Sequence, residues 1–153
     1  MTRFAVFAGM LLLLASPAAA GPDSAGPNWY KGNLHTHTNI SDGNTSPAVV
    51  AQWYRDNDYD FLSLTDHNKR ADADAIAAEI PPRAGPKKNK PFLLIPGEEL
   101  SDGYTVDKRG HALHYTALGI SRVVEPQGGK DFDEVTARSI RAVADAGGML
   151  ILN

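Results

Sequence analysis

The residues best suited to chemistry are the five histidines, which all lie between positions 35 and 114. His35 and His37 are separated by a single threonine. In an extended chain alternate side chains share a face, so the two imidazoles point the same way and can share a metal ion. The competing interpretation is a pair of partly exposed histidines at the end of a strand.

Other candidate ligands follow in three short motifs. Asp42 precedes a glycine, and three interpretations of it are open. It is a hard oxygen ligand, it orients a histidine ligand, or it belongs to a plain turn. His67 follows Asp66, which supports a ligand or caps a loop, although a single histidine after a strand is ordinarily a loop residue. Glu99 follows an apolar run and has two oxygens to share between cations, unless it is simply solvated.

The last two histidines, His111 and His114, are three residues apart. Along a regular strand this spacing puts them on opposite faces, so only one can join a common site. His114 borders the apolar run 115–120 and is the better candidate, whereas we assign His111 to a polar loop over residues 101–110. The tripeptide 101–103 repeats the Ser-Asp-Gly of 41–43, and we interpret it as a turn.

Composition limits the alternatives. The 153 residues include 15 Lys+Arg and 18 Asp+Glu, which argues against a broad basic surface for nucleic acid. A hydrophobic content of 42% is ordinary for a globular protein. The chain has no cysteine, so nitrogen and oxygen atoms must supply any metal ligands.

The first twenty residues have the pattern of a signal peptide. Arg3 is followed by an apolar run over residues 4–15 and by three alanines at 18–20, which suit a signal peptidase. The alternatives are a buried helix or an uncleaved anchor. We expect residues 1–20 to be removed, residues 21–28 to be a flexible lead-in, and the protein to be periplasmic or secreted without stable membrane association.

Strand and helix patterns alternate along the rest of the chain. Strands are predicted at 30–36, 61–65, 92–95, 113–120 and 149–152. Helices are predicted to begin at residue 46 and to span 71–80 and 131–146. Ser46 and Pro47 suit the first positions of a helix. Such alternation favours an α/β fold with a parallel sheet, whose functional groups gather where the strands end. The last strand has no helix after it, which we interpret as a truncated domain.

The ordered motifs resemble the PHP (polymerase and histidinol phosphatase) domain family over residues 29–153. The residues that carry the resemblance lie at 34–38, 41–43, 65–67, 96–99 and 114–119. It implies a distorted (β/α)7 TIM-like barrel, of which this chain would hold about four or five strands. Thr116 departs from the asparagine usual in the family, and two later motifs of the family would lie beyond Asn153.

The resemblance also implies roles for the residues. His35 and His37 would bind one metal ion, Glu99 would bridge it to a second that His114 also binds, and Asp42 and His67 would serve a third position. Asp42 and His67 are in addition the catalytic candidates. Two or three divalent ions (Zn, Mn or Fe) would be the cofactors.

These features predict a metal-dependent phosphoesterase that acts on a small phosphorylated substrate through metal-bound hydroxide. The 153-residue chain alone is expected to be inactive or poorly stable. One alternative is an amidohydrolase-like metal hydrolase that acts on C–N bonds. The other is a non-catalytic metal-binding module.

Overall fold

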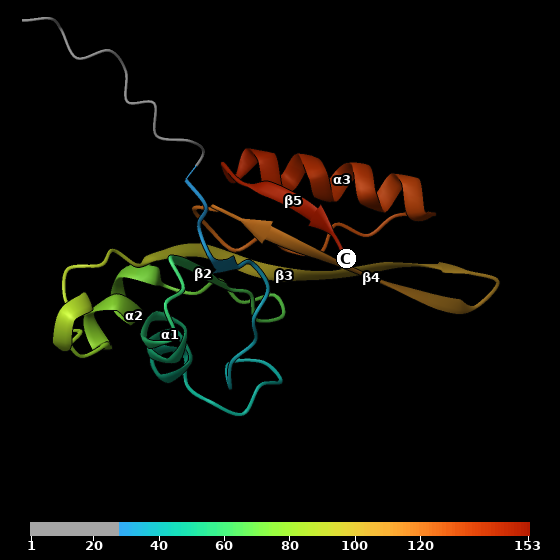
Figure 1. Ribbon diagram of the computed structural model, residues 1–153. Helices are drawn as coiled ribbons and strands as arrows, with labels where there is room; N and C mark the ends of the chain where they lie inside the picture. The colour runs from blue at the N-terminus through green and yellow to red at the C-terminus, as the bar shows by residue number, and fades with distance from the viewer. Residues whose placement is uncertain (1–27) are drawn as a thin grey trace, which may run out of the picture.

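The computed structural model describes residues 28–153, so the predicted signal peptide lies outside the described residues. The elements along the chain are β1 (Gly32–Asn33), α1 (Pro47–Asp56), β2 (Phe61–Leu64), α2 (Ala73–Glu79), the 3-10 helix η1 (Gly85–Lys87), β3 (Leu93–Val106), β4 (Arg109–Leu118), α3 (Phe132–Asp145) and β5 (Met149–Leu152) (Figure 1). The predicted alternation of strands and helices is therefore observed as far as β3. The first strand is much shorter than predicted.

The five strands form one open sheet in the order β1-β2-β3-β4-β5. β1, β2 and β3 run parallel, as the α/β pattern predicts. β4 is antiparallel to both β3 and β5, so the prediction of an all-parallel sheet is wrong for the second half of the domain. Residues 28–153 thus form a mixed five-stranded sheet with three α-helices.

The antiparallel half arises from a long hairpin that the sequence did not indicate. β3 continues to Val106 and pairs with β4 from Arg109 onward, so the predicted polar loop at 101–110 and the predicted turn at 101–103 are wrong. Asp107 and Lys108 make the turn with φ values of 48° and 65°. Two consecutive positive φ angles characterise the two-residue hairpin turn that glycine or asparagine usually signals. The hairpin projects from the body of the domain in Figure 1.

Local sequence explains where the helices begin. Pro47 opens α1 and Ser46 precedes it in an extended conformation, as predicted, although the Ser46 side chain makes no capping hydrogen bond. α2 begins after Asp72, whose carboxylate accepts a hydrogen bond from Ala75 N at 3.1 Å. α3 begins after Asp131, whose carboxylate accepts one from Glu134 N at 2.9 Å.

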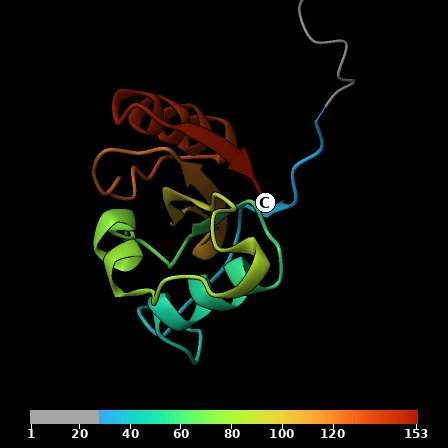
Figure 2. The ribbon, with the colours of Figure 1, turned by 60° about the vertical axis from the view of Figure 1, so that its left-hand side comes forward.

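The helices contact one face of the sheet and leave the other face free for a site. Leu62 and Leu64 of β2 pack in a core with α1 and α2. The register of β2 with β3 puts Leu100 on the same face of the sheet. Leu100 packs in a second core, which includes the buried side chains of α3. Because side chains alternate along a strand, Glu99 lies on the opposite face. Figures 1 and 2 show α3 beside the β5 end of the sheet and α1 with α2 beside the other.

Two helices leave large apolar side chains exposed. In α1, Ala51 is buried, but Val49 and Trp53 are 55% and 56% exposed. In α3, Val135 and Val143 are buried, whereas Ile140 is 51% exposed. Within residues 28–153, the helices are too short or too polar to cross a bilayer.

Candidate metal centre

Glu99 is the centre of the candidate site. Its side chain is 5% exposed and lies among four imidazoles. Oε2 is 2.8 Å from His37 Nε2, 3.3 Å from His67 Nδ1 and 3.5 Å from His35 Nε2. Oε1 is 2.9 Å from His114 Nδ1. One buried carboxylate thus divides its two oxygens between two sides of the cluster, which is the arrangement that bridging of two cations requires.

His35 and His37 face the same way, as their spacing predicts, although regular strand structure ends at Asn33. Their rings stack with centroids 5.0 Å apart, and their Nε2 atoms are 3.1 Å apart. The intervening Thr36 points away and continues the sheet pairing, because its carbonyl accepts a hydrogen bond from Thr65 N at 2.8 Å. The chain is therefore extended at these residues even without the full strand that was predicted.

Asp42 approaches two of the histidines from the loop after them. Its Oδ1 is 2.6 Å from His37 Nδ1 and its Oδ2 is 3.6 Å from His67 Nε2. The hydrogen bond from His37 lowers the pKa of Asp42 below its ordinary value, and Ser41 and His67 add to the effect. The group is a carboxylate at neutral pH, so His37 donates its Nδ1–H to it, and in the neutral form of the imidazole Nε2 presents a lone pair.

The loop that carries Asp42 is held by Asp66. The buried Asp66 carboxylate accepts hydrogen bonds from Thr38 N, Thr38 Oγ1, Ser41 N and Ser41 Oγ at 2.7 to 3.1 Å. Gly43 closes the turn with its N–H on Thr38 O at 2.8 Å, and an added Cβ would lie 2.8 Å from that oxygen. Asp66 therefore supports the candidate ligand Asp42 by holding its loop in place, which is one of the two roles that the sequence suggested for Asp66.

His67 and His114 reach the site from β-structure around Glu99. His67 forms a parallel bridge with Glu99, and its Nδ1 is 2.6 Å from Ser101 Oγ. His114 lies opposite Ser101 in the hairpin and so faces the cluster. His111 lies on the other face of β4, stacked on Tyr104 at 4.8 Å. Of the two, His114 faces the cluster and His111 does not, and His111 belongs to a strand and not to the predicted loop.

The structure brings together all six predicted ligands in three overlapping groups. The groups are His35, His37 and Glu99; His37, Asp42 and His67; and His67, Glu99 and His114, with ligand atoms within 4.8 Å in each group. This mixed nitrogen and oxygen donor set fits divalent Zn, Mn or Fe. Sequence reasoning missed Ser101 and Asn153 as neighbours of the cluster, because neither residue type stands out on its own.

We compared the chain with known proteins and report three solved structures to which it is similar. No family model and no curated protein matches it. The first structure is a two-domain protein from Bacteroides vulgatus containing a predicted PHP-like metal-dependent phosphoesterase, at 22% identity, a TM-score of 0.49 and 84% coverage of this chain. The second is a proposed metal-dependent phosphoesterase from Bifidobacterium adolescentis, at 25% identity, a TM-score of 0.38 and 57% coverage.

The third is an amidohydrolase from Chromobacterium violaceum, solved with bound sulfate and no metal, at 27% identity, a TM-score of 0.41 and 72% coverage. The present chain spans about a third of the length of these proteins: 36%, 27% and 33%.

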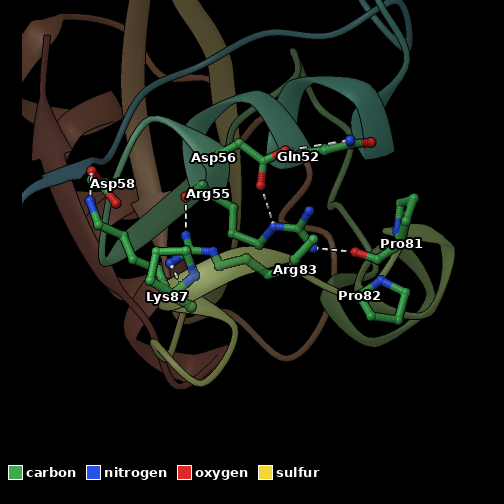
Figure 3. Close-up of a pocket in the computed structure, with 10 residues that line it drawn as sticks. Gln52, Arg55, Asp56, Asp58, Pro81, Pro82, Arg83 and Lys87 are labelled. Carbon is green, nitrogen blue, oxygen red and sulfur yellow. Dashed lines mark hydrogen bonds and ion pairs between the residues drawn. The ribbon is translucent and has the colours of Figure 1, made fainter.

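Apart from the metal-ligand cluster, a cavity of about 400 Å³ lies between the C-terminal half of α1 and the segment that precedes β3, and charged side chains line it (Figure 3). It includes part of the basic segment 83–90, which precedes β3. Arg55 Nε is 2.9 Å from Asp56, Lys87 pairs with Asp58, and Arg83 donates to the carbonyl of Arg55. These cations are neutralised or engaged within the protein, so the cavity is best explained as an ion-paired junction between α1 and the segment before β3.

Proposed function

We propose that the cluster binds two or more divalent cations and that the protein is a metal-dependent phosphoesterase. The observation that carries the proposal is the position of Glu99, buried with both oxygens among four imidazoles. His37 Nε2 and Glu99 Oε2 are 2.8 Å apart, and both present lone pairs when Asp42 holds the His37 Nδ1–H. A cation held by both atoms would replace this repulsion with attraction.

Adjacent divalent cations suit phosphoester hydrolysis. When bound, they neutralise phosphoryl oxygens, make water more acidic and stabilise the charge of the leaving oxygen. The protein's own groups would position the ions: Glu99 would be shared by two of them, His35 and His37 would hold one, and His114 another. Asp42 and His67 would serve the third position, with Asp42 kept ionised by its hydrogen bond with His37.

The wider proposal includes the architecture and the compartment. We propose that the sheet is part of a distorted (β/α)7 barrel of the PHP type, with the cluster at the mouth of its strands. The chain would be exported by residues 1–20, act on a small phosphorylated substrate, and bind neither nucleic acid nor membrane. N-terminal sequencing of the protein from a cell-fractionation experiment tests export, and the expected mature end is near Gly21.

Metal binding and hydrolysis test the activity. The full-length protein is titrated with Zn²⁺ and Mn²⁺ and then assayed on p-nitrophenyl phosphate, bis-p-nitrophenyl phosphate and a panel of amides. We expect cation binding, and phosphoester hydrolysis that EDTA abolishes and added metal restores. Absence of cation binding, a preference for the amides, or activity that survives loss of both His35 and His37 would overturn the proposal.

A further inference from the structure

A short chain of hydrogen bonds joins Glu99 to His35 through two residues that carry no charge. Asn153 Nδ2 is 3.2 Å from Glu99 Oε1. Thr116 Oγ1 is 2.9 Å from Asn153 Oδ1, and His35 Nδ1 is 2.6 Å from Thr116 Oγ1. Thr116 is 2% exposed and pairs with Glu99 across β3 and β4, so the sheet register fixes its position on the site face.

The chemistry of these groups determines the direction of each bond. An ionised carboxylate only accepts hydrogen bonds, so Asn153 must turn its amide NH₂ to Glu99 and its carbonyl oxygen to Thr116. A threonine hydroxyl has a single hydrogen, and this one is donated to the Asn153 oxygen. Thr116 can then only accept from His35. This contact is 2.6 Å long, against 3.4 Å between Asn153 Nδ2 and His35 Nδ1, so the shorter hydrogen bond puts the proton of His35 on Nδ1.

We propose that Thr116 is a positioning residue that fixes the tautomer of His35. The inference rests on the proposed metal centre, because its consequence is the direction of a metal ligand. With Nδ1 protonated, His35 presents the lone pair of Nε2, which lies 3.1 Å from His37 Nε2 and 3.5 Å from Glu99 Oε2. Asp42 has the same effect on His37.

The two fixed tautomers together create a preorganised cation site. Three atoms that only accept, two imidazole nitrogens and one carboxylate oxygen, converge within 3.5 Å of one another. Such a group is repulsive in itself and gains stability from a shared cation. Outer hydrogen bonds of this kind orient metal-binding histidines, and their loss typically lowers metal affinity by about 10- to 100-fold.

The test compares Thr116→Val, which keeps the shape and removes the hydroxyl, with Thr116→Ser, which keeps the hydroxyl. Imidazole ¹⁵N shifts of His35 are recorded in metal-free protein at pH 8, and Zn²⁺ affinity is measured by competition with a chelator. We expect the Nδ1–H tautomer in the original protein and in the serine variant. The valine variant should lose that preference and bind Zn²⁺ about 10- to 100-fold more weakly.

A second variant tests the direction of the chain. Asn153→Ala removes the acceptor of the Thr116 hydroxyl, which then becomes free to donate to His35, so the tautomer should shift toward Nε2–H. An Nε2–H tautomer in the original protein, or unchanged tautomers in both the valine and alanine variants, would overturn the inference. The tautomer of His35 is recorded without metal. Failure to bind Zn²⁺ would therefore count against the proposed function, whereas the role of Thr116 would still be decided by the tautomer measurement.

Discussion

Glu98 and Glu99 are consecutive residues of β3 whose carboxylates lie on opposite faces of the sheet. Glu99 faces the four histidines, whereas Glu98 is buried on the helix side and accepts a hydrogen bond from Val124 N at 2.8 Å. The other oxygen of Glu98 has no partner among the described residues. The two acids therefore form a natural pair of experiments, one on the site and one on the core.

Replacing each acid by its amide should separate metal binding from folding. Glu99→Gln removes the shared negative charge, so we expect Zn²⁺ affinity to fall by at least about 100-fold, the effect of losing an interaction worth some 2.7 kcal/mol or more. Glu98→Gln should leave that affinity within about threefold. Calorimetric titration of both variants measures this, and equal losses in the two would contradict the assignment of Glu99 to the centre.

The buried position of Glu98 predicts a pH-dependent stability. Burial raises its pKa from 4.5 to about 7. Between these values the folded protein keeps a proton that the unfolded chain has released, so the free energy of unfolding falls as pH rises through this window and levels off above it. Relative to Glu98→Gln, the original protein should lose about 2 kcal/mol between pH 5 and pH 8.

Urea unfolding in EDTA at several pH values measures the effect, and EDTA keeps metal binding out of the comparison. The amide cannot ionise, so the difference between the two proteins isolates this one carboxyl from the histidines. Parallel stability profiles for the two proteins would show that Glu98 ionises as freely in the folded state as in the unfolded chain.

Asp66 should be needed for the loop that carries Asp42. Asp66→Asn leaves one acceptor oxygen for four donors and turns an NH₂ group toward some of them, so we expect a loss of about 3 kcal/mol in stability. Asp72→Asn is the matched control, because asparagine caps a helix about as well as aspartate. Thermal unfolding of both variants tests this, and equal losses would count against the four-bond role of Asp66.

The sequence predicted the site better than it predicted the sheet. Spacing alone placed His35 with His37 and separated His114 from His111, because side-chain alternation holds in any extended segment. The antiparallel hairpin was missed because Asp107 and Lys108 adopt positive φ angles without a glycine. The roles of Thr116 and Asn153 depend on strands that are far apart in sequence, and spacing does not report such contacts.

The two histidines of β4 provide the final prediction, since they are the same residue type on one strand with opposite orientations. His114 Nδ1 lies 2.9 Å from Glu99 Oε1, whereas His111 stacks on Tyr104 at 4.8 Å. His114→Ala should remove one ligand and lower the number or affinity of bound Zn²⁺ ions by at least about tenfold. His111→Ala should leave metal binding unchanged and cost only the stacking contact, about 1 kcal/mol. Metal content by mass spectrometry, with unfolding curves for both variants, would decide, and loss of metal from His111→Ala with retention in His114→Ala would reverse the assignment of the two faces.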